Sequence, residues 1–493
     1  MHRSPHRCLW MLLAMSACLP VLAGNPNRGR DPAPVRERPA SAALDDALLP
    51  AVLFDNRPAP AWTLPERMAR HHVPGVGIAL IEDGRVAWSK GLGRTGNGEA
   101  PAVDATTRFQ MASLAKLLTA VAALRLVDQG KLDLDRDVDE MLTSWKLPPN
   151  PFTATTPVTL RQLLAHRAGI TVRGFAGYAE GDSLPDLQAI LAGRAPSNSP
   201  PVALDRVPGT VERYSGGGYQ IVQQLVEDAT GQPFIDVVRG QVLAPAGLAR
   251  TVAGPAPPPA SACGHGHDGL RVAGCAHRYP ETAAAGWWST PDDLARLALA
   301  LARAWRGEDD ALLGHATARA MLMPAGDGHS GLGPGVHGSG DALHFDQSGW
   351  NRGFRARLIL YPRLGKGIVV MANGDGGDVL INEIVRAAAR TYRWPDFQPA
   401  RRTAATLAPA ALAARAGAYA MDAGFVLHVE AREDHLRVRT PRGTLHAFHP
   451  LEPDRFVDPE EGTELRFDGA PDEPAASVSL WGMQGRRDAR GKP

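Results

Sequence analysis

Ser113 and Lys116 stand three residues apart in the stretch RFQMASLAKLLTAVAALRLVDQG, residues 108–130. Almost every residue between Met111 and Leu126 is apolar or alanine, which predicts a buried helix with both side chains on one face. A serine hydroxyl is a weak nucleophile until a neighbouring base takes its proton. Burial disfavours the charged form of a lysine, so Lys116 among leucines can serve as that base.

The start of this helix adds a second chemical feature. Backbone N–H groups near Met111 favour negative charge and can bind an oxyanion beside the serine. The alternative is a lysine that extends to solvent past an unrelated serine. S-x-x-K occurs only once in the chain and lies at the start of an apolar helix, which favours the chemical interpretation.

The elements around this helix are predicted from apolar periodicity and turn residues. Residues 76–93 are two β-prone runs around Asp83-Gly84, and residues 353–375 form a second hairpin that turns near Gly365. Helices are predicted within residues 159–169, 219–231 and 290–305, and a further helix is predicted through Ile381, Ile384 and Val385. For the third of these, Thr290 is the expected N-cap, followed by Pro291 and, three residues after the cap, Asp293.

Changes in composition divide the chain into segments. Residues 24–49 are rich in Pro, Arg and Asn without an apolar period and are interpreted as a linker, as are residues 397–411. Residues 412–493 show short alternations between turn residues, which is typical of a small all-β domain. Residues 50–396 are predicted to form an α+β domain, in which helices and a helical insertion accompany an antiparallel sheet with strands from both ends.

The first 23 residues have the layout of a secretory signal peptide. Arg3 and Arg7 precede an apolar core, which ends in small residues at a cleavage site. Pro20 interrupts this core, which is shorter than the roughly 20 residues that a spanning helix needs. We therefore expect a secreted or periplasmic protein without an integral membrane span; a lipoprotein acylated on Cys18 is the less favoured alternative.

Export leaves Cys263 and Cys275 as the cysteines of the mature chain. In an oxidising compartment two such cysteines usually form a disulfide. The stretch CGHGHDGLRVAGCAH, residues 263–277, also contains three histidines and an aspartate, so a zinc-dependent hydrolase is an alternative. The usual C-x-x-C and H-x-x-x-H spacings are missing there, which favours the disulfide, with no metal and no cofactor.

Several segments, in order, resemble the serine β-lactamase and DD-peptidase superfamily, in particular its class C-like branch of penicillin-binding protein-like hydrolases. The resemblance covers residues from about Pro60 to about Trp394 and is carried by these segments: FQMASLAKLLTAVAALRLVDQGKLDLDRDV, TLRQLLAHRAGI, RYSGGGYQIVQQLVEDATG, YPETAAAGWWSTPDDLARLALAL and FDQSGWNRGFRARLILYPRLGKGIVVMANGD. It implies a β-lactamase/transpeptidase-like fold and an acyl-enzyme mechanism.

The resemblance also implies roles for individual residues. Ser113 would be the acylated nucleophile and Lys116 its proton partner, while Tyr214 would be a second base that passes a proton to the leaving group. The N–H of Trp350 would join that of Ser113 in the oxyanion hole, and Gly349 would let the strand approach closely.

Two positions depart from the family pattern. The family often has Asn two residues after the tyrosine, where this chain has Gly216, and its third motif, commonly K-T-G or H-x-G, is Gln347-Ser348-Gly349 here. The Gln347 amide can hydrogen-bond a substrate carbonyl but cannot attract a carboxylate as a cation would. Recognition of an anionic substrate is therefore expected to differ from the family pattern.

These observations favour an exported serine hydrolase that forms an acyl-enzyme with a peptide, ester or lactam. Esterase or D-amino-acid peptidase activity is expected above β-lactamase activity, on a small-molecule or peptide substrate that could derive from the cell wall. The alternative is a non-catalytic binder or sensor of cell-wall peptides. The net charge of +1 offers no field for nucleic acid, and the absence of G-x-S-x-G excludes an α/β-hydrolase nucleophile.

Overall fold

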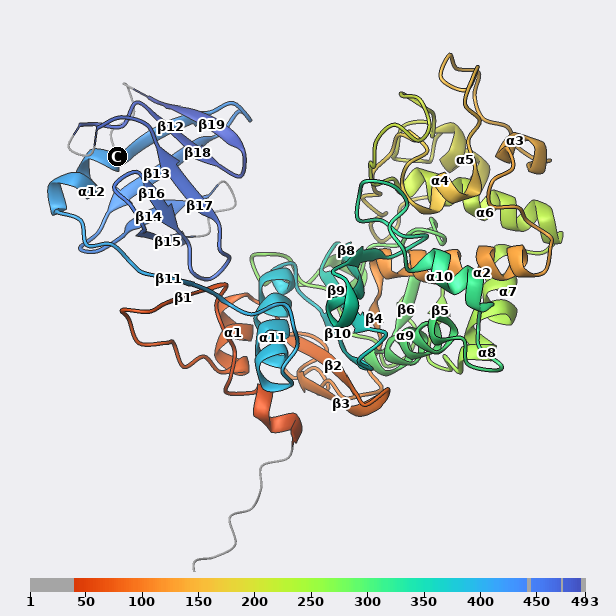
Figure 1. Ribbon diagram of the computed structural model, residues 1–493, viewed down its shortest axis with the longest axis horizontal. Coiled ribbons are helices and arrows are strands. Elements are labelled where there is room, and N and C mark those ends of the chain that lie inside the picture. Colours follow the sequence, from red (N-terminus) through yellow and green to blue (C-terminus); the bar gives the residue numbers. More distant parts are fainter. Residues whose placement is uncertain (1–39, 441–444, 471–472, 489–493) are drawn as a thin grey trace, which may run out of the picture. The chain divides into compact units, whose positions relative to one another are not determined.

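The main body of the protein is built on a six-stranded antiparallel sheet (Figure 1). The computed structural model describes residues 40–440, 445–470 and 473–488, so the expected signal peptide and most of the first linker lie outside the described residues. The strand order is β3-β2-β10-β9-β8-β7, which joins the two ends of the domain in one sheet. Its strands are β2 (Gly75–Glu82), β3 (Arg85–Gly93), β7 (Gly335–His337), β8 (His344–Asn351), β9 (Phe354–Tyr361) and β10 (Lys366–Ala372).

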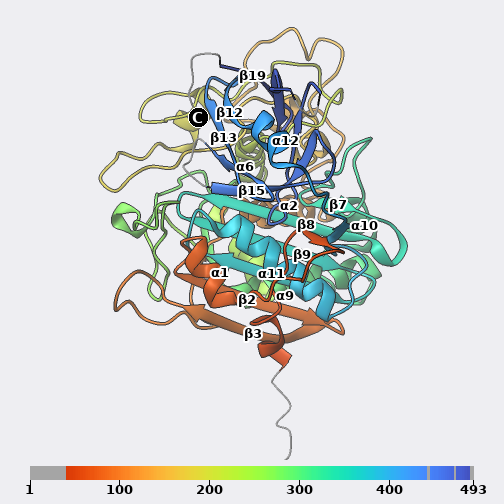
Figure 2. The same cartoon turned by 90° about the vertical axis from the view of Figure 1, so that its left-hand side faces the viewer.

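The sheet is buried on both faces. Along β10, Ile368 and Val370 belong to one hydrophobic cluster, whereas Val369 and Met371 belong to the other, as the alternation of a strand requires. Helices α11 (Gly377–Thr391) and α1 (Leu64–Arg70) belong to the first cluster, and α9 (Pro291–Arg306) belongs to the second. Figure 2 shows α11 lying across the strands of the sheet.

Between β3 and β7 the chain forms the predicted helical insertion. It holds α2 (Ala115–Asp128), α3 (Val138–Met141), α4 (Leu160–Leu164), α5 (Leu187–Ala192), α6 (Gly216–Thr230), α7 (Phe234–Val238), α8 (Ala244–Ala246) and α10 (His315–Met321). A small sheet of the strands β4 (Phe109–Gln110), β6 (Trp287–Ser289) and β5 (Val252–Ala253) leads into α2. The insertion and one face of the main sheet share a single hydrophobic cluster.

Helix α9 shows how local signals and tertiary contacts combine. Thr290 is the N-cap, as predicted, and its side chain accepts the backbone N–H of Asp293. The Asp293 carboxylate accepts the N–H of Arg250 at 2.8 Å and the hydroxyl of Thr251 at 2.9 Å. This buried aspartate thereby ties the start of α9 to the chain before β5, a contact that sequence spacing does not predict.

The C-terminal region is a closed barrel of eight strands, β12 to β19. The strands are β12 (Gly417–Met421), β13 (Val426–Ala431), β14 (Leu436–Arg439), β15 (Leu445–Pro450), β16 (Arg455–Val457), β17 (Glu464–Phe467), β18 (Ser477–Leu480) and β19 (Met483–Arg487). Helix α12 (Pro409–Arg415) precedes it, and β1 (Val52–Phe54) pairs in parallel with β11 (Ala400–Arg402). The predicted α+β fold with a small β domain is confirmed.

No helix in the described part of the chain has both the length and the apolar character that crossing a bilayer requires.

Candidate active site

Ser113 lies in a tight turn, η2 (Ala112–Leu114), which leads directly into α2. The sequence predicted one continuous helix, whereas the chain forms a 3-10 turn at the serine. Ala112 has a φ of 48°, in the left-handed region that is unfavourable for a residue with a side chain. Strain of this kind persists only where the surroundings enforce it, and both Ala112 and Leu114 are fully buried. The serine is therefore presented on a rigid turn.

Strand β8 approaches this turn closely at Gly349. A Cβ at position 349 would lie 2.5 Å from the carbonyl oxygen of Met111 and 3.1 Å from the Cβ of Ala112. A side chain would therefore push the strand away from the turn that carries Ser113. The next residue, Trp350, lines the cavity described below, and the oxyanion role of its N–H stays a prediction.

Lys116 is held against Ser113 at the start of α2. Its side chain is 2 % exposed, and Nζ donates to Ser113 Oγ at 3.2 Å and to the carbonyl oxygen of Ala284 at 3.0 Å. The hydroxyl of Thr119, one turn later, donates to the carbonyl oxygen of Ala283 at 2.8 Å. Two side chains of α2 thus fasten the turn before β6, and that turn fixes the ammonium nitrogen beside the nucleophile.

Tyr214 lies on the other side of Lys116, just before α6. Lys116 Nζ is 4.9 Å from the centroid of the Tyr214 ring and 5.5 Å from that of Tyr219. At these distances Lys116 Nζ faces both aromatic rings. The Tyr219 hydroxyl donates to the carbonyl oxygen of Leu164, so Tyr219 is a packed residue of the insertion. Tyr214 lines the cavity with Ser113 and Lys116.

His166 completes this group and was not singled out from the sequence. Its ring is 4.3 Å from the ring of Tyr214, centroid to centroid, and its Nδ1 accepts the N–H of Ser215 at 3.2 Å. Burial and the nearby Lys116 lower the pKa of His166 to about 3. A neutral imidazole therefore holds the backbone next to Tyr214. Its position just after α4, inside TLRQLLAHRAGI, was the available signal.

A cavity of about 590 Å³ opens in front of these groups. Of the residues predicted for the site, it is lined by Ser113, Lys116, Tyr214, Gln347, Ser348 and Trp350. Gln347 is 7 % exposed, and its Nε2 donates to the carbonyl oxygens of Ser113 and Ser348, each at 3.3 Å. The third motif therefore places a neutral amide next to the nucleophile, where the family commonly has a cation.

Gly216 lies against the loop that carries Arg173 and Phe175. A Cβ at position 216 would lie 3.0 Å from the ring of Phe175 and 3.3 Å from the carbonyl oxygen of Arg173. An asparagine there would require Phe175 to move. The ring of Phe175 thus packs against Gly216, the position where the family often has asparagine. Both Arg173 and Phe175 line the cavity.

Charged groups beside Gln347 neutralise one another. Asp346 lies 3.3 Å from His337 Nε2 and 3.0 Å from a guanidinium nitrogen of Arg357. The hydrogen bond to Asp346 raises the pKa of His337. Burial opposes ionisation of Asp346, but His337 and Arg357 together hold the pKa of this carboxyl below its usual value. Neither His337 nor Asp346 belongs to a recognisable motif, so sequence spacing gave no sign of the pair.

Cys263 and Cys275 form a disulfide, as predicted. The histidines of the loop that it closes serve structural contacts: His265 is buried with Nδ1 3.0 Å from the carbonyl oxygen of Asn373, and His267 offers its carbonyl oxygen to His72. His277, after the loop, lies with Nδ1 3.1 Å from the carbonyl oxygen of Ala176. The groups of possible metal ligands found among the described residues lie elsewhere.

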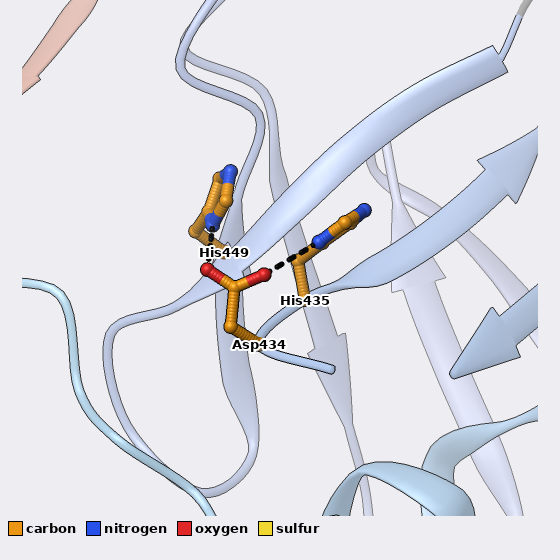
Figure 3. Close-up of side chains that lie close together, drawn as sticks. All are labelled: Asp434, His435 and His449. Carbon is orange, nitrogen blue, oxygen red and sulfur yellow. Dashed lines mark hydrogen bonds and ion pairs between the residues drawn. The ribbon is translucent and has the colours of Figure 1, made fainter. Parts of the chain in front are cut away.

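One of those groups is Asp434, His435 and His449 in the barrel (Figure 3). Asp434 is 2.8 Å from His435 Nδ1. A guanidinium nitrogen of Arg57 lies 2.8 Å from the Asp434 carboxylate and 2.9 Å from His449 Nδ1. Burial and Arg57 lower the pKa of His449 to about 4. A cationic side chain already occupies the space between two of the three groups, so the cluster is best described as an arginine-bridged contact.

Comparisons with known proteins identify the family of this chain. The family described as Beta-lactamase matches residues 63–391. Penicillin-binding protein 4 of Amycolatopsis lactamdurans is 33% identical over 179 residues, which is 36% of this chain and 44% of that protein. The matched segment thus spans less than half the length of this relative.

Solved structures share the fold. The octameric penicillin-binding protein homologue from Pyrococcus abyssi superimposes with a TM-score of 0.60 and 21% identity, covering 86% of this chain and 98% of the other. The D-amino acid amidase from Ochrobactrum anthropi SV3 gives a TM-score of 0.56 with 21% identity, over 72% of this chain and 98% of its own.

The family match extends over two thirds of the chain and includes both the Ser113 turn and the strand of Gln347. The chain therefore belongs to the Beta-lactamase family, within the serine β-lactamase and DD-peptidase superfamily.

Proposed function

We propose that this protein is an exported serine hydrolase that forms an acyl-enzyme through Ser113. The single observation that carries the proposal is the 3.2 Å contact between Lys116 Nζ and Ser113 Oγ at the wall of an open cavity. A buried lysine one turn from a serine has no structural need to contact that hydroxyl, whereas a nucleophile needs a proton acceptor within hydrogen-bond reach.

The proposed acylation uses Ser113, Lys116 and Tyr214 in turn. Ser113 Oγ attacks the acyl carbon of the substrate, and its proton passes to the Lys116–Tyr214 pair. In this pair Lys116 Nζ is 4.9 Å from the centroid of the Tyr214 ring. The same pair returns the proton to the departing amine or alcohol as the bond to the acyl carbon breaks. Water then attacks the serine ester, which releases the acid and restores the hydroxyl.

The substrate class is inferred from the wall of the cavity. Gln347 offers an amide in place of a cation, and Phe175 and Trp350 offer aromatic surface. Trp350 is 66 % exposed, and an exposed tryptophan in a cavity wall is suited to pack against an apolar group. We therefore rank esters and D-amino-acid amides or peptides above β-lactams. A neighbour of the same fold, described as a D-amino acid amidase, supports testing amides first.

A panel of substrates tests this ranking. The purified natural protein is assayed with p-nitrophenyl esters, D-amino-acid amides, their L-enantiomers and nitrocefin. The Lys116→Met variant is assayed with the same substrates. Methionine keeps the length and the apolar stem while removing the proton acceptor, so we expect turnover to fall by at least a hundredfold. Turnover of nitrocefin above that of every ester and amide would overturn the ranking.

A non-catalytic binder of cell-wall peptides is the second candidate, because Gly216 and Gln347 depart from the family pattern. Such a protein would bind peptides without hydrolysing any member of the panel. Equal, undetectable turnover by the natural protein and Lys116→Met, with retained peptide binding, would favour this candidate.

Export is proposed from the first 23 residues. Expression of the full sequence in a Gram-negative bacterium should yield protein in the periplasm whose intact mass lacks residues 1–23. A mass that retains these residues would contradict export by this route, and a lipid adduct on Cys18 would support the lipoprotein form instead.

A further inference from the structure

We infer that Arg173 supplies a cation in place of the one that the third motif lacks, so that among ester and peptide acyl donors the site prefers those that carry a carboxylate. The inference deepens the proposed function and rests on it. It follows from the position of Arg173 in the cavity wall and from the backbone hydrogen bonds that fasten its loop to the start of α6.

Arg173 is an exposed residue in the wall of a cavity that also holds Lys116, Glu212 and Asp346. Asp346 is paired with His337 and Arg357, and the Glu212 carboxylate accepts the N–H of Ser330 at 3.1 Å. Among the described residues, no carboxylate lies within ion-pair distance of the Arg173 guanidinium. An unmatched guanidinium in a substrate cavity is suited to bind a carboxylate through paired, charge-assisted hydrogen bonds.

The backbone of this loop is fastened to the start of α6. The N–H of Gly216 donates to the carbonyl oxygen of Arg173 at 2.9 Å, and that of Gly217 donates to the carbonyl oxygen of Val172 at 3.0 Å. A Cβ at position 216 would lie 3.0 Å from the ring of Phe175. The backbone at positions 216 and 217 therefore fixes the loop that carries Arg173 at the cavity.

The two departures from the family pattern are then complementary. At position 347 of β8 a neutral amide stands in place of the family's cation. The Gln347 Nε2 donates to two backbone carbonyl oxygens. Arg173, on the loop beside Gly216, offers a different cation in the wall of the same cavity. Arg352, which follows the third motif directly, does not line the cavity and lies 3.3 Å from the carboxylate of Asp375, so it is a weaker candidate for this role.

Two thioesters that differ in one charge test the inference. Benzoyl-D-alanyl thioglycolate carries a carboxylate on its leaving group, and its carboxamide counterpart does not. The measured quantity is the ratio of kcat/KM for the acid to that for the amide. Because one charge-assisted interaction is lost, we expect Arg173→Gln to lower this ratio roughly five- to thirtyfold.

Matched variants separate the local effect from net charge. Arg194→Gln removes the same charge from an exposed arginine outside the cavity and should leave the ratio unchanged within twofold. Arg173→Lys keeps the charge and should retain more of the ratio than Arg173→Gln does. For the natural protein, raising the salt concentration from 0.05 to 0.5 M, values chosen to change screening strongly, should lower the ratio as well.

A cation returned to β8 provides the rescue. In the Arg173→Gln background, Gln347→Lys should restore the preference for the acid, whereas Gln347→Lys alone should add less, because the two cations then serve one carboxylate. If Arg173→Gln and Arg194→Gln leave the same ratio, the inference is wrong.

A separate assay distinguishes a failure of the proposed function from a failure of the role of Arg173. Labelling by a fluorophosphonate reports acylation of Ser113 without any carboxylate on the probe. Absence of labelling in the natural protein would contradict the proposed function itself. Labelling that persists in every variant, with no change of the thioester ratio in Arg173→Gln or on addition of salt, would contradict only the role of Arg173.

Discussion

At the scale of single residues, the neutral histidine beside Tyr214 makes folding stability depend on acid pH. The pKa of His166 is about 3 in the folded protein against an ordinary value of 6.5, so the unfolded chain binds more protons between these values. The contribution of His166 to stability is therefore full above about pH 6.5 and is lost as the pH falls toward 3.

His166→Asn removes this dependence while keeping an acceptor for the Ser215 N–H. Between pH 7.5 and pH 5, the natural protein should lose about 2 kcal/mol more unfolding free energy than the variant does. Urea unfolding at both values measures the difference. An equal loss of unfolding free energy in the two proteins would show that protonation of His166 does not destabilise the fold. The buried imidazole would then not be held neutral.

The sequence predicted the chemistry of the nucleophile better than its surroundings. Ser113 and Lys116 could be paired from spacing alone, because residues three apart share a helix face. The strained φ of Ala112 and the neutral state of His166 depend on packing by distant segments, so no local pattern announces them. The match between Gly216 and Phe175 likewise requires two segments 41 positions apart to meet, since 216 − 175 = 41.

At the scale of elements, the turn between residues 281 and 285 positions Lys116 and carries a buried acid. The carbonyl oxygen of Ala284 accepts a hydrogen bond from Lys116 Nζ, and the N–H groups of Ala284 and Ala285 donate to the carbonyl oxygen of Glu281. The Glu281 side chain is 0 % exposed, and both carboxylate oxygens lack a hydrogen-bond partner among the described residues. Burial accordingly raises the pKa of Glu281 to about 7.

This acid should make the protein less stable at alkaline pH. The folded pKa lies above the ordinary 4.5, so the contribution of Glu281 is full below pH 4.5 and is lost as the pH rises through 7. From pH 5 to pH 8, Glu281→Gln should gain up to about 3 kcal/mol relative to the natural protein. Unfolding curves at both pH values decide this, and a constant difference between the two proteins would refute it.

The disulfide loop is a second element whose contribution can be measured. Cys263 and Cys275 close a short loop, so replacing both by serine should cost about 3 kcal/mol at most. The loop also packs against the β8–β9 turn, where a Cβ at Gly264 would lie 2.8 Å from the Phe354 ring. We expect one bridge and no free thiol in the mature protein by thiol titration under denaturing, non-reducing conditions; two titratable thiols would refute the pairing.

At the scale of the whole molecule, the parts that could be predicted are those with local signals. Asp83-Gly84 and Gly365 mark hairpin turns, and the strands on either side form as predicted. The closure of the C-terminal strands into a barrel could not be predicted, because pairing between β12 and β19 joins segments far apart in sequence. Strands β4 and β5 have two residues each, too few to show a period.

The order of elements nevertheless predicted the architecture. Strand-rich segments at both ends of residues 50–396 implied one sheet, and β2 and β10 do pair along six positions. In the sheet that this pairing closes, β8 follows β10 and β9. Its Gln347 lines the same cavity as Ser113, which lies in the turn before α2. The site thus depends on the whole domain, since its residues come from the insertion and from the sheet.

Covalent labelling of the intact chain decides whether Ser113 is the nucleophile. The purified protein is treated with a fluorophosphonate, digested, and the labelled peptide identified by mass spectrometry, beside Ser113→Ala and the control Ser330→Ala, which removes another serine of the cavity wall. We expect a stoichiometric adduct on Ser113, retained in Ser330→Ala and absent in Ser113→Ala, whose unfolding free energy stays within about 1 kcal/mol of the natural value. An adduct on a different serine, or labelling that survives in Ser113→Ala, would contradict the acyl-enzyme mechanism at Ser113.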